Sequence, residues 1–118
     1  MPSQQGVSRS PLKPVEFLIL AVLFDEPLHG YGIVQQIEER TAGRVQLRPG
    51  DVYRVIYRLA ERGLLEDAQR RAVDSGDERR TYYAITEEGQ EVARSEAEML
   101  SDVSAALVSK TAGQGTTK

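Results

Sequence analysis

Arginine is the residue type whose chemistry and spacing are most informative in this chain. Residues 44–80 hold nine arginines and no lysine, although the whole chain has 15 basic and 18 acidic residues and a formal net charge of −3. The guanidinium group is a planar fork that matches phosphates and guanine edges better than an ammonium does. This concentration of arginine indicates a surface for nucleic acid. A solvated helix face with ion pairs is an equally open interpretation from composition alone.

Other chemistry has little support in the sequence. The chain has no cysteine and one histidine, His29, so we expect no metal site, no cofactor and no thiol chemistry. His29 has no acid–base partner nearby in sequence and is interpreted as a turn histidine with structural hydrogen bonds. The neighbouring glycines Gly30 and Gly32 lack the Lys-Ser/Thr of a phosphate-binding loop. The sequence therefore predicts that the protein is not an enzyme.

Hydropathy points to a single soluble domain. The longest near-continuous apolar run, Phe17 to Phe24, is far shorter than a membrane span. Residues 1–12 lack the apolar core of a secretory signal. We therefore expect a cytoplasmic protein with no membrane partner, in which residues 1–11 and 111–118 are disordered tails.

Three helices and a hairpin are predicted in the main domain, residues 12–85. The helices cover Val15–Phe24 after Pro14 in the first turn, Tyr31–Thr41, and Pro49–Arg62. Residues 28–32 are predicted as a turn, and Arg44–Leu47 as a brief strand. Two strands, Leu64–Val73 and Arg79–Ile85, flank the turn signal Asp74–Glu78. This order predicts a mainly α (α+β) fold, a winged helix-turn-helix with a two-stranded wing.

The third helix has one apolar and one polar face. At 100° per residue the inward face holds Val52, Val55, Ile56 and Leu59, and the outward face holds Arg54, Tyr57 and Arg58. In a winged helix-turn-helix this helix lies across the major groove, so Arg54 and Arg58 are expected to meet phosphates or base edges. Arg79 and Arg80, on the return strand of the wing, are expected to lie near the DNA backbone.

The last helix, residues 86–110 with Thr86 as N-cap, carries an apolar stripe that exceeds what its own domain can cover. A two-fold mate is the simplest partner, so we predict a homodimer. The dimer residues are expected to be Phe17 and Leu20 of the first helix with Val92, Met99, Leu100, Val103 and Leu107 of the last. The alternative is an amphipathic helix that folds back on its own domain.

Four sequence motifs, taken in order, resemble the PadR family of transcriptional regulators. They are L-H-G-Y-G-I (28–33), R-P-G-D-V-Y-R-V-I-Y-R-L (48–59), R-G-L-L (62–65) and R-R-T-Y-Y-A-I-T-E-E-G (79–89). The resemblance extends over residues 12–107 and is closest to the short form of the family, which has a single C-terminal dimerisation helix. It implies a dimeric winged-helix protein that binds double-stranded DNA, usually a repressor, with release by small molecules in some members.

The resemblance also implies roles at the start of the third helix. Pro49, Gly50 and Tyr53 would lie at its DNA-facing entry, and Tyr53 would reach a phosphate. Asp51 stands where the family often has a small hydroxyl residue. Its carboxylate is interpreted first as a partner for the helix dipole, and alternatively as an acceptor for a cytosine amino group.

The leading hypothesis is a sequence-specific DNA-binding repressor. The alternative is a winged-helix module for protein–protein contact, in which the basic face is incidental. The chain has no tryptophan, so it lacks the residues with which some short-form relatives hold flat aromatic drugs. A small apolar or aromatic effector in a pore lined by Met99 and aliphatic side chains is still an open hypothesis.

Overall fold

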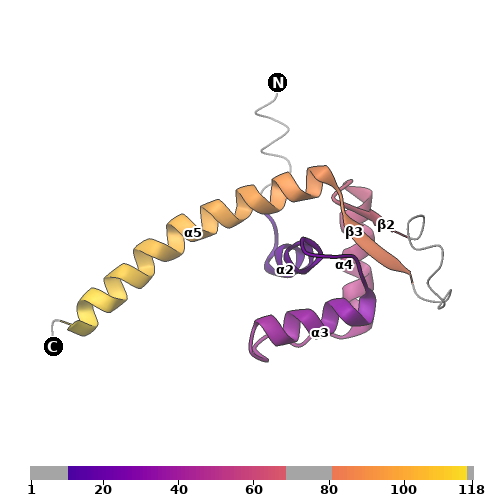
Figure 1. The fold of residues 1–118 in the computed structure, drawn as a ribbon. Helices are drawn as coiled ribbons and strands as arrows, with labels where there is room; N and C mark the ends of the chain where they lie inside the picture. The colour runs from indigo at the N-terminus through magenta and orange to yellow at the C-terminus, as the bar shows by residue number, and fades with distance from the viewer. Residues whose placement is uncertain (1–10, 69–80, 117–118) are drawn as a thin grey trace, which may run out of the picture.

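The computed structural model describes residues 11–68 and 81–116, and all structural statements here concern those residues. The helices and strands follow one another as shown in Figure 1. They are α2 (Pro14–Leu23), β1 (Leu28–His29), α3 (Gly30–Arg40), α4 (Pro49–Glu61), β2 (Leu65–Asp67), β3 (Tyr82–Ile85) and α5 (Glu87–Thr116).

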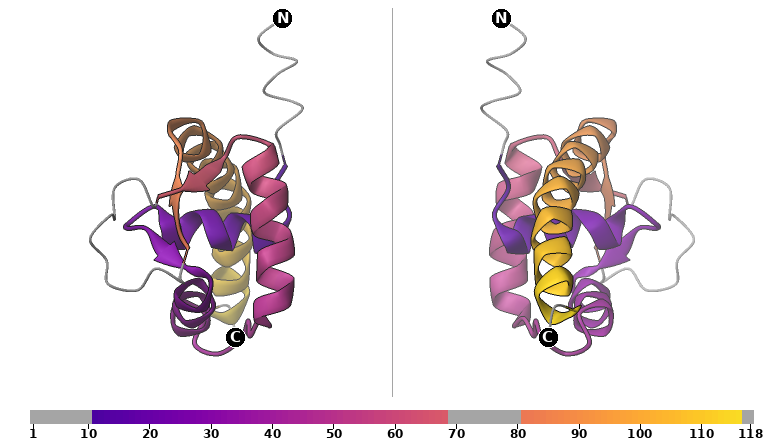
Figure 2. Two further views of the ribbon diagram at one scale, coloured as in Figure 1. Left: turned by 90° about the vertical axis from the view of Figure 1, so that its right-hand side faces the viewer. Right: turned by 90° about the vertical axis from the view of Figure 1, so that its left-hand side faces the viewer.

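Helix α2 is the centre of the core. It contacts α3, α4, α5 and β3, and its side chains Ile19, Leu20 and Leu23 are fully buried. Pro14 begins the helix at a position where its missing N–H costs nothing. Nearly every residue of α2 is apolar because the helix is covered on several sides. Figure 1 shows α2, α3, α4 and the sheet grouped near one end of α5, and Figure 2 shows the same elements from two sides with α5 foreshortened.

Helices α3 and α4 bury the faces predicted from their periodicity. Ile33, Val34 and Ile37 of α3 and Val52, Ile56 and Leu59 of α4 belong to the core, and Val55 is half-buried. Gly63 follows α4 with a φ of 77°, a left-handed conformation that glycine adopts without strain. Residues 44–47, between the two helices, form no strand, and Val45 and Leu47 pack against the core instead. The predicted brief strand is therefore wrong.

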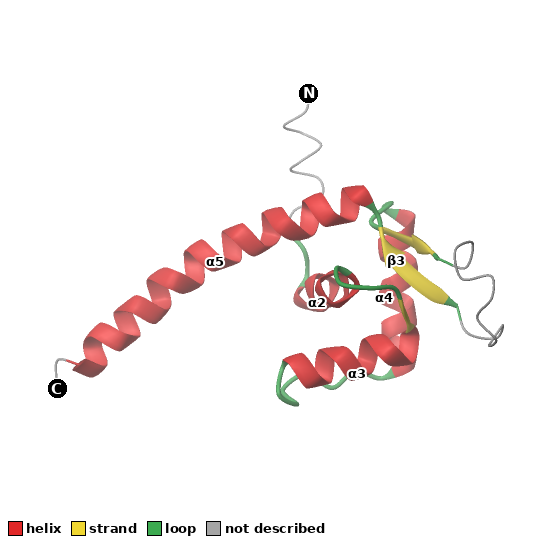
Figure 3. Cartoon of the chain, viewed as in Figure 1, coloured by secondary structure: helices red, strands yellow, loops and turns green. Residues whose placement is uncertain are grey.

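The sheet has three strands, where the sequence predicted a two-stranded wing. Strand β1 lies within the segment predicted as a turn and pairs antiparallel with β3, Leu28 opposite Tyr83 and His29 opposite Tyr82. Strand β2 pairs with the other edge of β3, which gives the order β1-β3-β2. Figure 3 shows β3 and its neighbouring strand in yellow. A two-residue strand is too short for a period-2 signal, so the sequence pattern could not reveal it. The predicted turn at residues 74–78 lies outside the described residues.

His29 is the N-cap of α3, which agrees with its interpretation as a structural turn residue. Its Nδ1 accepts a hydrogen bond from the backbone N–H of Gly32 at 3.0 Å, and its ring meets the Tyr82 ring edge-on at 5.2 Å. We expect His29→Ala to lower the free energy of unfolding by about 1 kcal/mol, because a cap is lost. His29→Asn should recover part of this loss, since its side-chain oxygen can accept the same bond. Urea denaturation of both variants measures the difference; equal losses would show that the cap contributes nothing.

Helix α5 begins as predicted and ends later than predicted. The Thr86 hydroxyl accepts a hydrogen bond from the Gly89 N–H at 2.9 Å and donates one to the Gly63 carbonyl at 2.7 Å, so Thr86 is an N-cap. The helix then continues to Thr116, past the expected end at Lys110. Gly113 and Gly115 favour an earlier end, but a helix already formed gains a hydrogen bond for each residue that it adds. The disordered tail predicted for residues 111–118 stays a prediction.

Only the first turns of α5 are packed on the domain. Val92, Ala93 and Glu96 are buried, whereas every residue from 97 to 110 is exposed. Figure 1 shows the second half of α5 projecting away from the other elements.

Candidate nucleic-acid interface

The outer surface of α4 gathers most of the residues predicted to bind DNA. Seven of the nine lie on this helix and reach the surface: Pro49, Gly50, Asp51, Tyr53, Arg54, Tyr57 and Arg58. The other two, Arg79 and Arg80, lie outside the described residues. Arg54 and Tyr57 are the most exposed of the large side chains, at 71% for the Arg54 side chain and 61% for Tyr57.

The exposed side chains of α4 divide into an outermost residue and two flanks. Arg54 lies nearly opposite Val52, because successive helix residues are about 100° apart. Tyr53 and Tyr57 lie on the flank toward the sheet, with ring centroids 6.5 Å apart. Arg58 lies on the opposite flank, toward α2, where its Nη1 is 3.9 Å from Glu16 Oε2. If α4 lies in the major groove, Arg54 would therefore point at the bases. The two flanks of the helix would then face the phosphate backbones of the two DNA strands.

Tyr53 packs directly over the first residue of α3. A Cβ atom built on Gly30 would lie 2.6 Å from both Cζ and the hydroxyl oxygen of Tyr53. A side chain at residue 30 would force the Tyr53 ring to move from this position, which gives a physical reason for the glycine after His29. Tyr53 is thus also a contact between the two helices of the helix-turn-helix, a role that the sequence analysis missed.

The backbone at the start of α4 is open to solvent. A Cβ atom on Gly50 would meet nothing within 4 Å, so the packing of this chain does not require glycine there. A helix N-terminus without a side chain lets a phosphate approach the backbone N–H groups. Asp51 lies in the first turn, where its carboxylate favours the helix dipole, and its Oδ1 is 3.4 Å from Arg54 Nη2. This position fits the first of the two interpretations of Asp51.

Tyr83 of β3 is buried near Tyr53 and Tyr57 of α4. Burial raises the pKa of Tyr83 to about 12, with smaller contributions in the same direction from Tyr57, Tyr53 and Asp67. Tyr83 is therefore a neutral hydroxyl at physiological pH.

Glu16 of α2 is a buried acid that the sequence analysis passed over. Its carboxylate lies 3.5 Å from Arg62 Nη1 as well as 3.9 Å from Arg58 Nη1. The signal for it was available, since Glu16 is the single charged residue in the run P-V-E-F-L-I-L-A-V-L.

The predicted dimer residues fall into two groups. Met99, Leu100, Val103 and Leu107 are exposed along α5, and Phe17 is half-buried. Leu20 and Val92 are 0% and 7% exposed and belong to the core of the chain itself, so their assignment to a dimer surface is wrong. The first turns of α5 pack on α2, and this contact already covers both side chains.

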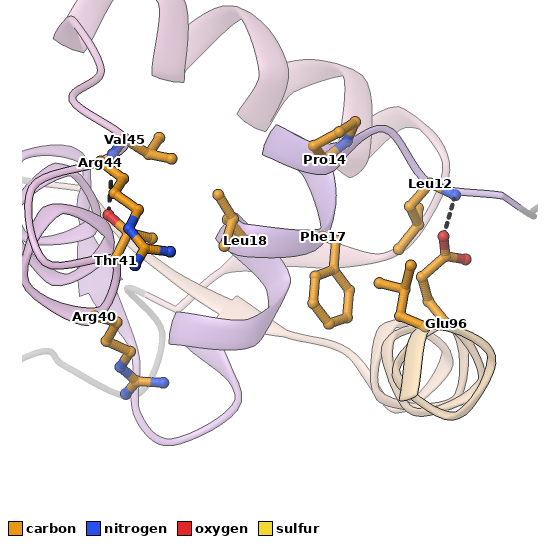
Figure 4. A pocket seen from close by; sticks show the side chains of 10 residues that line it. Leu12, Pro14, Phe17, Leu18, Arg40, Thr41, Arg44, Val45 and Glu96 are labelled. Atoms are coloured by element: carbon orange, nitrogen blue, oxygen red, sulfur yellow. Dashed lines mark hydrogen bonds between the residues drawn. The ribbon is translucent and has the colours of Figure 1, made fainter. Parts of the chain in front are cut away.

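A groove of about 490 Å³ lies between α2, the end of α3 and α5 (Figure 4). Its lining combines apolar side chains, among them Leu12, Phe17 and Leu100, with Arg40 and Arg44. The Leu12 N–H donates a hydrogen bond to Glu96 Oε2 at 3.1 Å, which ties the segment before α2 to α5. Leu100 lines the groove and is also part of the exposed apolar stripe of α5. The groove is therefore continuous with that stripe.

The described part of the chain contains neither a metal-binding cluster nor a membrane-spanning helix. No group of three His, Cys, Asp or Glu side chains is placed to hold a metal ion among these residues. None of the helices described is both long enough and apolar enough to cross a bilayer.

The crossing of α3 and α4, followed by the small sheet, defines a winged helix-turn-helix protein with a long C-terminal helix. The family model "Transcriptional regulator PadR-like family" matches residues 19–95, and the chain belongs to this family. It is therefore a transcriptional regulator, which implies DNA binding, and not an enzyme. The resemblance seen in the sequence motifs is confirmed.

Solved structures share this fold, and one curated relative is similar in sequence. A PadR family transcription regulator from Clostridium difficile superposes with a TM-score of 0.69 at 22% identity, covering 84% of this chain and 99% of that one. A transcriptional regulator from Clostridium thermocellum gives 0.66 at 26% identity, covering 81% and 87%. An uncharacterized protein from Lysinibacillus sphaericus is 30% identical over 76 residues, which are 64% of this chain and 68% of that protein.

Proposed function

We propose that this regulator is a dimeric, sequence-specific repressor in which α4 enters the major groove of its operator. The observation that carries the proposal is the exposed outer surface of α4, on which Arg54 is the outermost cation. Arginine at such a position can form two hydrogen bonds to guanine O6 and N7. Tyr57 and Arg58 on the two flanks would donate to phosphates, and the wing arginines Arg79 and Arg80 would add backbone contacts.

A homodimer supplies the second half-site. The exposed stripe of Met99, Leu100, Val103 and Leu107 needs a cover, and the same stripe of a second copy provides one by two-fold symmetry. Two recognition helices related in this way read a palindromic operator, with half-site centres about one helical turn, or a multiple of it, apart. A repressor of this kind acts in the cytoplasm on the chromosome and blocks transcription by occupying its operator.

Release by a small apolar or aromatic effector is the regulatory part of the proposal. The groove between α2 and α5 has a volume in the range of small-molecule sites, and most of its lining is apolar. A ligand there would lie against Phe17 and Leu100, two of the proposed dimer residues. It would therefore alter the angle between the two protomers and the spacing of their recognition helices.

Substitution of Arg54 tests whether α4 reads bases. Arg54→Ala should cost about 1–3 kcal/mol on the preferred operator and relax the base preference at one position in each half-site, because one pair of base contacts is lost. The free energy of unfolding should change by less than about 0.5 kcal/mol, since the side chain is exposed. The measurement is a titration against single-base variants of an operator selected from a random duplex pool.

The control is Arg94→Ala, which removes the same charge from α5, where Arg94 lies over the Phe24 ring. This variant should keep the base preference. If Arg54→Ala weakens all sequences equally, Arg54 contacts phosphate only. If it weakens none, α4 is not the reading element, and a protein–protein contact module becomes the better description.

A further inference from the structure

Glu16 is a buried carboxylate whose partners belong to the recognition helix. Its side chain is 4% exposed, and burial of a charge is costly unless the charge is paired and hydrogen-bonded. One oxygen, Oε1, accepts a hydrogen bond from the Lys13 N–H at 2.8 Å. The other, Oε2, faces Arg62 at 3.5 Å and Arg58 at 3.9 Å. Glu16 thus connects the start of α2 to Arg58 of α4 and to Arg62, which is the C-cap of α4.

Arg58 has a buried ion-pair partner, whereas the partner of Arg54 is exposed. The Arg58 side chain is 43% exposed and lies at a hollow of about 470 Å³ between α2 and α4, which Glu16 and Val55 also line. Arg54 is 71% exposed, and its pair with Asp51 at 3.4 Å joins two side chains that are both open to solvent. Exposed pairs of this kind hold a side chain weakly. Arg54 and Arg58, which the sequence predicts to act together, therefore differ in the burial of the carboxylate that each one faces.

We propose that Glu16 is a positioning residue for operator recognition, an inference that rests on the proposed function. It holds the Arg58 guanidinium on the α2 flank of α4, where Arg58 meets a phosphate of one strand. Phosphate contacts set the register of a protein on the duplex, and base contacts then specify the sequence. An Arg58 that is already oriented fixes the register in which Arg54 meets the base edges.

Charge alone would favour a neutral residue at this position. The carboxylate of Glu16 offsets part of the positive charge of Arg58 and Arg62, so it weakens attraction to any duplex. A neutral glutamine in its place would let the protein bind DNA of every sequence more tightly but would orient Arg58 less well. Glu16 is therefore expected to contribute selectivity at the expense of affinity for nonspecific DNA.

The test compares Glu16→Gln with Glu61→Gln. In the first variant the amide oxygen of the new glutamine can still accept the Lys13 N–H, so the substitution removes the charge and keeps the hydrogen bond. Glu61 is an exposed acid on α4, and its substitution makes the same change in charge at the surface of that helix and leaves Glu16 in place. Fluorescence anisotropy with the selected operator and with a nonspecific duplex, at several salt concentrations, gives the ratio of the two affinities.

We expect Glu61→Gln to tighten both duplexes alike and to leave the ratio within about twofold, because it adds only charge. Glu16→Gln should tighten the nonspecific duplex and lower the ratio about tenfold, the size of a lost base contact. In an Arg58→Ala background, Glu16→Gln should no longer change the ratio. Equal ratios for Glu16→Gln and Glu61→Gln would overturn the inference. If the unsubstituted dimer shows no preference for any operator, the proposed function fails first.

A measurement on the unsubstituted protein keeps the inference testable if Glu16→Gln does not fold. The side-chain Nε–H groups of Arg54 and Arg58 can be compared by ¹⁵N heteronuclear NOE on the free dimer. We expect a rigid Arg58 Nε–H and a mobile Arg54 Nε–H. Equal mobility of the two would show that Glu16 does not hold Arg58.

Discussion

Gly89→Ala is expected to lower the free energy of unfolding by more than about 3 kcal/mol, the largest effect of any single substitution considered for this fold. A Cβ atom at residue 89 would clash with the carbonyl oxygen of Leu64 and would lie 2.8 Å from Ile85 Cγ1. The Leu64 oxygen cannot move aside cheaply, because it accepts the Thr86 N–H at 3.1 Å. Helix α5 would have to withdraw from the sheet, and the buried contact of Val92 with the core would be lost.

Urea denaturation of Gly89→Ala measures this loss, and Gly50→Ala is its control. Both substitutions place alanine in a helix, where its intrinsic preference exceeds that of glycine by about 1 kcal/mol. Because a Cβ at Gly50 meets nothing within 4 Å, Gly50→Ala should be neutral or slightly stabilising. Any difference between the two variants therefore reports the steric contact. A Gly89→Ala protein as stable as the unsubstituted chain would show that α5 does not begin against Leu64.

The sequence predicted most accurately those features that depend on local periodicity. The buried faces of α3 and α4, the proline that begins each of α2 and α4, and the Thr86 cap all follow from residues within one or two turns of each other. The motif T-E-E-G at residues 86–89 also has a local explanation in part, because Thr86 caps the N–H of Gly89. The contact of Gly89 with Leu64 could not be predicted from the sequence, because it joins α5 to the residue before β2, which is distant along the chain.

Contacts between distant residues account for the features that the sequence analysis missed or misplaced. Strand β1 exists because β3 lies beside it. Glu16 is tolerated in an apolar helix because Arg58 and Arg62 approach it from α4. An apolar stripe shows which side chains need cover but not what covers them, so Val92 was assigned to a mate although its own core contains it.

Leu100→Glu combined with Val103→Glu is expected to convert the proposed homodimer into a 13.1 kDa monomer. Both side chains are exposed in the single chain, Val103 at 64%, so the two carboxylates should leave the fold of the free protomer intact. In a dimer that covers the stripe, the same carboxylates would be buried without partners. Each unpaired buried charge costs several kcal/mol, so two of them in each protomer should outweigh the apolar contacts of the stripe. Sedimentation equilibrium at micromolar concentration measures the mass directly.

The matched control is Ser101→Glu combined with Ala105→Glu, which adds the same two charges to the opposite side of α5. Both of these residues are exposed, and neither lies on the stripe, so this variant should stay dimeric. The monomeric variant should also lose operator affinity by about a hundredfold or more, because its two half-sites are no longer bound as one unit. Thermal denaturation should confirm that its winged-helix domain is folded. If both double variants have the same mass, or if the unsubstituted chain is a monomer, the stripe is not a dimer surface. The proposal that a symmetric dimer binds a palindromic operator would then fail as well.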